Sequence, residues 1–120
     1  MLQDPTSLPE SSFERLSITD PAALVALLPA LRPAQLTFAL EHLGANAPNE
    51  IAVPALIAHM SHASALVREG ALIGADYCTR DSRIAGALAE VAASDPNDGL
   101  RKEAQGLLDE ITQWGPYEKD

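Results

Sequence analysis

A five-residue pattern that occurs twice constrains the fold of this chain more than any other feature. Val67-Arg68-Glu69-Gly70-Ala71 recurs 33 residues later as Leu100-Arg101-Lys102-Glu103-Ala104. Both copies place an aliphatic residue, an arginine and an alanine at helical spacing after a polar turn. A unit of this length cannot bury its own apolar face, so it has to stack on neighbouring units. The repeat therefore predicts a solenoid of stacked helices.

Composition agrees with a helical fold and excludes two classes of partner. The chain is 47% hydrophobic but only 4% aromatic, and alanine and leucine, its main apolar residues, favour helices over sheets. A net charge of -9 argues against nucleic acid, which requires clustered lysine and arginine. No run of about 18 apolar residues is present, so we expect no membrane-spanning segment. The single cysteine, Cys78, cannot form an internal disulfide, and we expect a cytoplasmic protein.

Proline, aspartate and glycine residues mark the boundaries of the expected helices. Asp20-Pro21 is a strong helix start, because aspartate caps free amides and proline suits the first helical position. Gly44 is expected to end the second helix, since glycine suits the left-handed position that follows a helix. The punctuation predicts helices over residues 21–28, 33–44, 50–60, 66–78, 83–93 and 99–114.

The two ends of the chain are expected to lie outside the repeats. Residues 1–19 contain Pro5 and Pro9 and are predicted to be an irregular arm. The segment 11–14 has the spacing of a capping box, so a short helix there would cover the open end of the solenoid with Phe13, Leu16 and Ile18. The alternative is an arm that makes no contacts. The expected organisation is an arm (1–19), a repeat domain (20–115) and a C-terminal tail (116–120).

Apolar residues at helical spacing define the expected core. Gly70 and Gly74 lie one turn apart, and each weakens a helix by up to about 1 kcal/mol relative to alanine. We therefore expect a neighbouring helix, or the backbone of a partner, to approach them closely. Cys78 falls on the same stripe and is predicted to be a small core residue. The predicted core comprises Leu36, Leu40, Leu43, Val67, Ala71, Gly74, Ala75, Cys78, Leu100, Ala104, Leu107, Leu108 and Ile111.

The repeated segments resemble the HEAT repeats. The segments 67–71 and 95–104 are similar to the inner-helix motif of that family, an aspartate-led turn followed by an aliphatic residue, an arginine and an alanine. The resemblance covers roughly residues 21–114. It implies an all-α, right-handed solenoid of about three antiparallel helix pairs. It also implies a structural role for Arg68 and Arg101, which would pair with acids of a turn or of a neighbouring repeat, such as Asp95.

Residue patterns that carry chemistry are sparse. His59 and His62 have the i, i+3 spacing of a zinc site, but no third ligand accompanies them and His62 is expected in a turn. The sequence has no glycine-rich phosphate loop, serine elbow, pair of cysteines or recognisable carboxylate dyad. We therefore assign no catalytic residue, metal or cofactor.

A surface for binding another protein is the remaining hypothesis. In HEAT repeats the second helix of each pair lines the concave side, which here implies an acidic face with apolar islands. We predict a non-enzymatic adaptor, scaffold or assembly factor that binds a basic amphipathic segment of another protein. Alternatives are an ordinary solvated face, and a small accessory enzyme or lyase-like subunit with a site in the groove. The predicted partner-binding residues are Phe38, Glu41, His42, Glu69, Ile73, Asp76, Tyr77, Asp109 and Glu110, with Lys102 beside them.

Overall fold

Helices make up all of the regular structure in the part of the chain that the structure describes. The computed structural model describes residues 5–114. No strand occurs in this range, which confirms the predicted all-α class. No helix in it is long and apolar enough to span a membrane. The helices are α1 (Glu10–Thr19), α2 (Pro21–Leu27), α3 (Pro33–Asn46), α4 (Asn49–His59), α5 (Ala65–Asp76), α6 (Ser82–Ser94) and α7 (Asp98–Trp114), with short 3-10 helices at Pro5–Ser7 and Leu28–Ala30.

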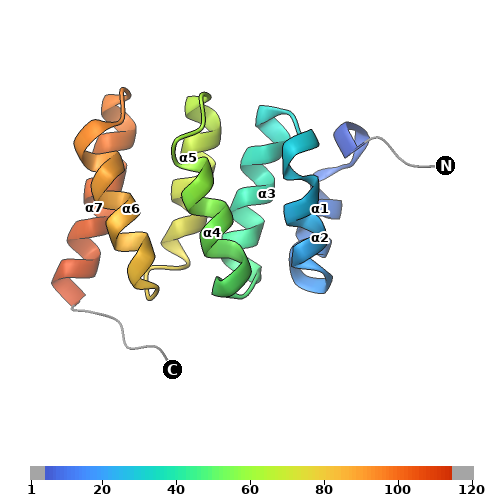
Figure 1. Ribbon diagram of the computed structural model, residues 1–120, viewed down its shortest axis with the longest axis horizontal. Helices are drawn as coiled ribbons and strands as arrows, with labels where there is room; N and C mark the ends of the chain where they lie inside the picture. The colour runs from blue at the N-terminus through green and yellow to red at the C-terminus, as the bar shows by residue number, and fades with distance from the viewer. Residues whose placement is uncertain (1–4, 115–120) are drawn as a thin grey trace.

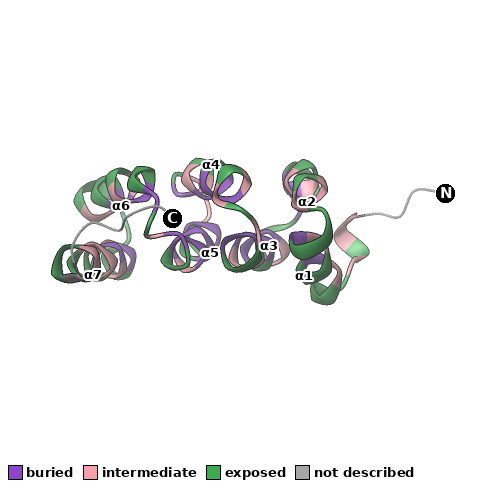
Figure 2. Ribbon diagram, turned by 90° about the horizontal axis from the view of Figure 1, so that it is seen from below, coloured by how far each residue is buried: buried purple, intermediate pink, exposed green. Residues whose placement is uncertain are grey.

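The helices lie in two rows (Figures 1 and 2). Figure 2 shows α1, α3, α5 and α7 in one row and α2, α4 and α6 in the other, so consecutive helices alternate between the rows. The body is elongated along the rows and thin across them, with extents of 50 × 35 × 17 Å. Buried residues face the space between the rows, and each row keeps one solvent-exposed side.

A buried residue at every sixteenth position holds the two rows together. Each helix from α2 to α7 contributes one such residue near its middle, and all six have no solvent exposure. Each helix and the turn that follows it have a similar combined length. The chain therefore returns to the same interior layer at a regular spacing, once per helix. The residues are Leu24, Leu40, Leu56, Leu72, Leu88 and Ala104.

The ends of α2 to α7 lie within two residues of the predicted helix boundaries. The carboxylate of Asp20 accepts a hydrogen bond from the Ala23 N–H at 3.2 Å, which caps α2 as predicted. The first turns of α6 and α7 are stabilised in the same way: Asp81 accepts from the N–H of Arg83 at 3.0 Å, and the Asn97 side chain accepts from the third residue of α7 at 3.1 Å. Local capping therefore sets where these helices begin.

The prediction that Gly44 ends a helix is wrong. Helix α3 continues to Asn46, and Gly44 instead lies where α3 contacts α5. A Cβ atom added to Gly44 would overlap the carbonyl oxygen of Gly74 and lie 2.5 Å from its Cα atom. A Cβ added to Gly70 would lie 2.8 Å from the Cα atom of Thr37. The expected close approach to Gly70 and Gly74 is therefore confirmed, with α3 as the approaching helix.

The N-terminal segment forms helix α1, the short helix that was one of the two alternatives for residues 1–19. The predicted capping box is not formed, because Ser11 lies inside α1 and the N-cap residue, Pro9, has no side chain that can accept a hydrogen bond. Phe13 is 1% exposed and joins the core. The buried Ser17 accepts a hydrogen bond from the Asn46 side chain of α3 at 3.0 Å. Of the two alternatives, the packed helix holds, although Ile18 is exposed. The predicted tail (116–120) lies outside the described residues.

Candidate functional site

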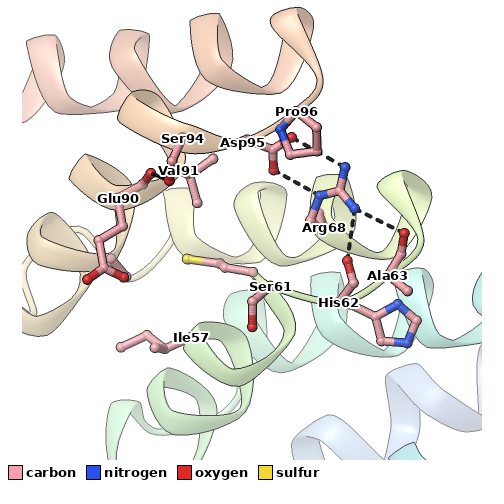
Figure 3. Close-up of a pocket in the computed structure, with 12 residues that line it drawn as sticks. Ile57, Ser61, His62, Ala63, Arg68, Glu90, Val91, Ser94, Asp95 and Pro96 are labelled. Carbon is pink, nitrogen blue, oxygen red and sulfur yellow. Dashed lines mark hydrogen bonds and ion pairs between the residues drawn. The ribbon is translucent and has the colours of Figure 1, made fainter.

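Arg68 joins helix α5 to the turn between α6 and α7. Its Nε atom donates to Oδ2 of Asp95 at 2.8 Å, and its Nη2 atom donates to Oδ1 at 3.3 Å. Its Nη1 atom donates to the carbonyl oxygens of His62 and Ala63 at 2.8 and 3.1 Å (Figure 3). Both side chains of the ion pair are buried. The predicted structural role of Arg68 is therefore confirmed, and its carboxylate partner comes from the neighbouring turn.

The turns before α5 and α7 share one hydrogen-bond pattern. Arg101 donates to the carbonyl oxygen of Asp95 at 2.6 Å, just as Arg68 donates to that of His62, and each acceptor lies six residues earlier. In both turns the side chain at that earlier position also accepts from the backbone N–H two residues later, at 2.8 Å for Asp95 and 3.0 Å for His62. An imidazole nitrogen thus replaces a carboxylate oxygen without changing the turn.

A cavity lies between α4 and α6, above the Arg68–Asp95 pair. Its volume is about 630 Å³, and the side chains of Ile57, Val91 and Glu90 lie around it in Figure 3. Apolar and polar residues contribute about equally to its lining, and two of the charged ones, Arg68 and Asp95, are bonded to each other. We call it the α4–α6 cavity; it is lined by Ile57, Met60, Ser61, His62, Ala63, Arg68, Ala87, Glu90, Val91, Ser94, Asp95 and Pro96.

The two histidines of the possible zinc spacing serve the local structure. Their rings stack with centroids 6.1 Å apart. The Nδ1 atom of His59 bonds to the carbonyl oxygen of Ala55 at 2.7 Å, whereas Nδ1 of His62 accepts from the N–H of Ser64. His62 lies in the turn after α4, as predicted. Among residues 5–114, no three histidine, cysteine, aspartate or glutamate side chains are arranged to hold a metal ion.

Cys78 belongs to the core. Its side chain is 1% exposed, and its Sγ atom lies 3.6 Å from the carbonyl oxygen of Gly44. Burial, together with the nearby Asp81 carboxylate, raises the pKa of the Cys78 thiol to about 11. The thiol is therefore protonated and unreactive near neutral pH. The predicted role of Cys78 as a small core residue is confirmed.

Four carboxylates from three neighbouring helices crowd one side of the row formed by α1, α3, α5 and α7. Burial raises the pKa of Glu41, His42 lowers it, and repulsion from Glu10 and Glu69 raises it further, with a net increase. Burial also raises the pKa of Glu103, with further contributions from Glu69 and Asp76. Glu69 thus lies near both Glu41 of α3 and Glu103 of α7. We call this group of carboxylates the acidic face; it comprises Glu41, Glu69, Asp76 and Glu103.

Large apolar side chains are exposed on the helices that carry the acidic face. Phe38 is 40% exposed and lies one helical turn before Glu41 on α3. Tyr77 is 64% exposed at the end of α5, and Ile73 is half-buried on the same helix. These three predicted residues therefore present apolar surface beside the carboxylates.

Three other predicted residues have their own local partners. His42 turns toward α1, where its Nε2 atom lies 3.2 Å from Oε1 of Glu10. Asp109 accepts a hydrogen bond from the Gln105 side chain at 2.9 Å. Lys102 pairs with a carboxylate at the start of its own helix at 3.1 Å. Glu110 is exposed farther along α7.

Sequence reasoning missed two residues of this surface, Glu103 and Leu66. Glu103 occupies the position in α7 that Gly70 occupies in α5, as the alignment of the two repeats shows. Because Gly70 faces the preceding helix of its row, that alignment indicates that Glu103 faces α5. Leu66 is 46% exposed at the start of α5. It lies outside the predicted buried stripe of this helix, so that stripe could not identify it.

A groove opens between α5 and α7 next to these residues. Its volume is about 410 Å³. Glu69 contributes one wall from α5 and Glu103 the other from α7, with apolar groups between them. We call it the α5–α7 groove; it is lined by Ala65, Leu66, Glu69, Asn97, Gly99, Leu100 and Glu103.

Comparison with known proteins finds no matching family model, curated protein or solved structure. A function therefore has to be argued from the geometry. The acidic face with its exposed apolar side chains and the α5–α7 groove is the surface whose chemistry specifies a ligand most clearly. The α4–α6 cavity is larger, but the charged pair at its base is already satisfied internally.

Proposed function

We propose that the protein is a HEAT-like, right-handed solenoid that binds a basic amphipathic segment of another protein on its acidic face. The two alternating rows of helices and the interior residue at every sixteenth position support the solenoid. The matching hydrogen bonds of Arg68 and Arg101 support equivalent turns in successive repeats. In this proposal the helices of the two rows form the antiparallel pairs that the family resemblance implies.

The observation that carries the binding proposal is the crowding of carboxylates from neighbouring helices, which His42 offsets only in part at Glu41. Burial and like-charge repulsion raise the pKa of Glu41 and Glu103, so these groups are held in an unfavourable electrostatic environment. A cationic ligand would relieve that repulsion, and the exposed Phe38, Leu66 and Tyr77 would supply apolar contact. At protein interfaces, charged side chains commonly steer the approach of the ligand, and apolar side chains supply most of the affinity.

The proposed role is adaptor or scaffold, acting by binding and not by catalysis. The bonds already made at the α4–α6 cavity favour this role, because Arg68, Asp95 and His62 each hold a turn in place. We place the protein in the cytoplasm, an assignment supported by its buried, unpaired cysteine. The partner is a protein, because the net charge of -9 opposes binding to nucleic acid.

A synthetic probe tests the proposal without knowledge of the natural partner. The probe is an 18-residue helical peptide with leucine on one face and lysine on the other. A second peptide, in which glutamate replaces every lysine, is the reference that the acidic face should repel. Glu69→Lys with Asp76→Lys reverses charge on the acidic face. Glu50→Lys with Glu90→Lys makes the same change in net charge on α4 and α6, the opposite row. Circular dichroism checks that both variants remain folded.

We expect the acidic-face variant to associate about tenfold more slowly than the wild type in stopped-flow measurements at low salt. The opposite-row variant should change the rate by less than about twofold, because its charges lie on the other side of the body. Added salt should reduce the difference. Equal slowing in both variants would indicate attraction by net charge alone and would refute a binding surface on the acidic face.

A further inference from the structure

The α5–α7 groove is lined by apolar residues and by two carboxylates, those of Glu69 and Glu103, which we call the rim carboxylates. Leu66 and Leu100 contribute the apolar surface, and Leu66 is 46% exposed. The carboxylates of Glu69 and Glu103 come from the helices on either side. No lysine or arginine is among the lining residues. The groove therefore offers both apolar contact and negative charge.

The cationic side chains of the two helices that form the groove are engaged elsewhere. Arg68 pairs with Asp95 and is buried. Arg101 and Lys102 both pair with Asp98, at 3.0 and 3.1 Å. These are all the lysines and arginines of α5 and α7. The rim carboxylates thus keep their charge available for a cation supplied from outside.

We infer that the groove receives a lysine side chain from the basic segment that binds the acidic face, an inference that rests on the proposed function. The aliphatic stem of lysine would lie against Leu66 and Leu100 while its charged end reaches the rim carboxylates. The ammonium is a compact charge with three donors, so it can serve carboxylates on two different helices. Arginine, whose planar fork matches a single carboxylate, is a poorer fit.

The partial burial of Glu103 strengthens this assignment. A charge pair removed from bulk water interacts more strongly than an exposed one. Burial and repulsion from Glu69 and Asp76 raise the pKa of Glu103, and a bound ammonium would lower it again. Lysine binding should therefore weaken as the pH falls and Glu103 takes up its proton.

Small amines test the groove independently of any peptide. We would titrate isotope-labelled protein with millimolar n-butylammonium, which reproduces the lysine side chain, and follow backbone amides by NMR. Parallel titrations use n-butanol (no charge), n-butylguanidinium (the arginine equivalent) and magnesium chloride (charge without an apolar stem). Glu103→Gln removes one rim carboxylate, and Glu110→Gln, exposed on the same helix outside the groove, is the matched control.

We expect butylammonium to shift amides of residues 65–69 and 97–103, with an affinity about five- to tenfold lower in Glu103→Gln and unchanged in Glu110→Gln. Equal shifts from butanol or from magnesium, or tighter binding of butylguanidinium, would overturn the lysine assignment. If butylammonium does not bind but the lysine–leucine peptide still requires Glu69 and Asp76, the groove inference fails while the proposed function stands. If butylammonium binds and the peptide does not, the groove takes free amines only and both proposals fail.

Discussion

The two sides of helix α5 differ in how closely the neighbouring helix of the row approaches. On the side of α3, Gly70 and Gly74 let the backbones touch, so a Cβ atom at Gly74 would lie 2.6 Å from the carbonyl oxygen of Leu40. On the side of α7, the repeat places Glu103 and Leu107 at the positions equivalent to Gly70 and Gly74. These larger side chains prevent the same approach, and the α5–α7 groove lies between the two helices.

The difference shows that one repeat pattern can produce two kinds of contact. The α3–α5 contact depends on shape, supported by a hydrogen bond of 2.6 Å from the Thr37 hydroxyl to the carbonyl oxygen of Leu66. The Arg68–Asp95 ion pair, in addition to the shared apolar core, connects α5 to the turn between α6 and α7. A tight contact leaves no room for a ligand, whereas a bridge of charged side chains holds two helices together and leaves surface accessible beside it.

The largest expected effect comes from breaking the tight contact with Gly44→Ala. The added methyl group would overlap the carbonyl of Gly74, and backbone cannot move aside as a flexible side chain can. We expect the free energy of unfolding to fall by about 3 kcal/mol or more, measured by urea denaturation. Gly86→Ala in α6 is the matched control, because its Cβ meets no atom within 4 Å.

Gly86→Ala should stabilise the protein by up to about 1 kcal/mol through helix propensity. If Gly44→Ala were equally stabilising, the close approach of α3 to α5 would be wrong. Such a result would also leave the difference between the two sides of α5 without a steric cause.

The second expected effect, somewhat smaller, concerns the charged bridge. Asp95→Asn preserves the shape of the side chain but leaves the buried Arg68 guanidinium without its counter-charge. We expect a loss of about 2 kcal/mol of stability. Asp98→Asn removes an exposed carboxylate that pairs with Arg101 and Lys102, and it should cost less than about 1 kcal/mol. Thermal denaturation of the two variants compares them, and equal losses would contradict the role assigned to the buried pair.

The smallest expected effect is the pH dependence of stability that Glu103 contributes. Glu103 lies on the α7 side of α5, at the position that Gly70 occupies in the aligned repeat. Its pKa is raised in the folded state, so the folded protein binds this proton at higher pH than the unfolded chain does. The contribution of Glu103 to stability therefore increases as the pH falls through the raised pKa and levels off below the ordinary value of 4.5. Solvent screening keeps the effect below about 1 kcal/mol.

Glu103→Gln should accordingly melt slightly above the wild type at pH 7, and the difference should shrink as the pH is lowered toward 5. Differential scanning calorimetry at the two pH values measures this, with Glu110→Gln as the exposed reference. A variant that melts below the wild type at pH 7 would indicate that the Glu103 carboxylate is stabilised by a contact and not crowded by its neighbours.

The positions of the helices can be predicted well from the sequence, but the roles of Gly44 and Glu103 cannot. Asp20-Pro21 was identified as a helix start, and the residue that it caps bonds to it as expected. Gly44 was interpreted by the local rule for helix ends, whereas its role is to contact a helix about 30 residues away. Glu103 lies outside the surface positions that the family resemblance implies. The feature of the sequence that marks it is the replacement of Gly70 by a glutamate in the aligned repeat.

The sequence by itself determined the helical class, the helix boundaries and the buried stripes of α3 and α5, because capping, proline geometry and apolar spacing act within a few residues along the chain. In α7 the predicted Leu107, Leu108 and Ile111 are only half-buried. Only the tertiary structure decided which of the two arginines Asp95 pairs with, that Gly44 meets Gly74 and that Glu69 lies near both Glu41 and Glu103. These contacts depend on the distance between helices, which is set by the sizes of side chains that come from different repeats.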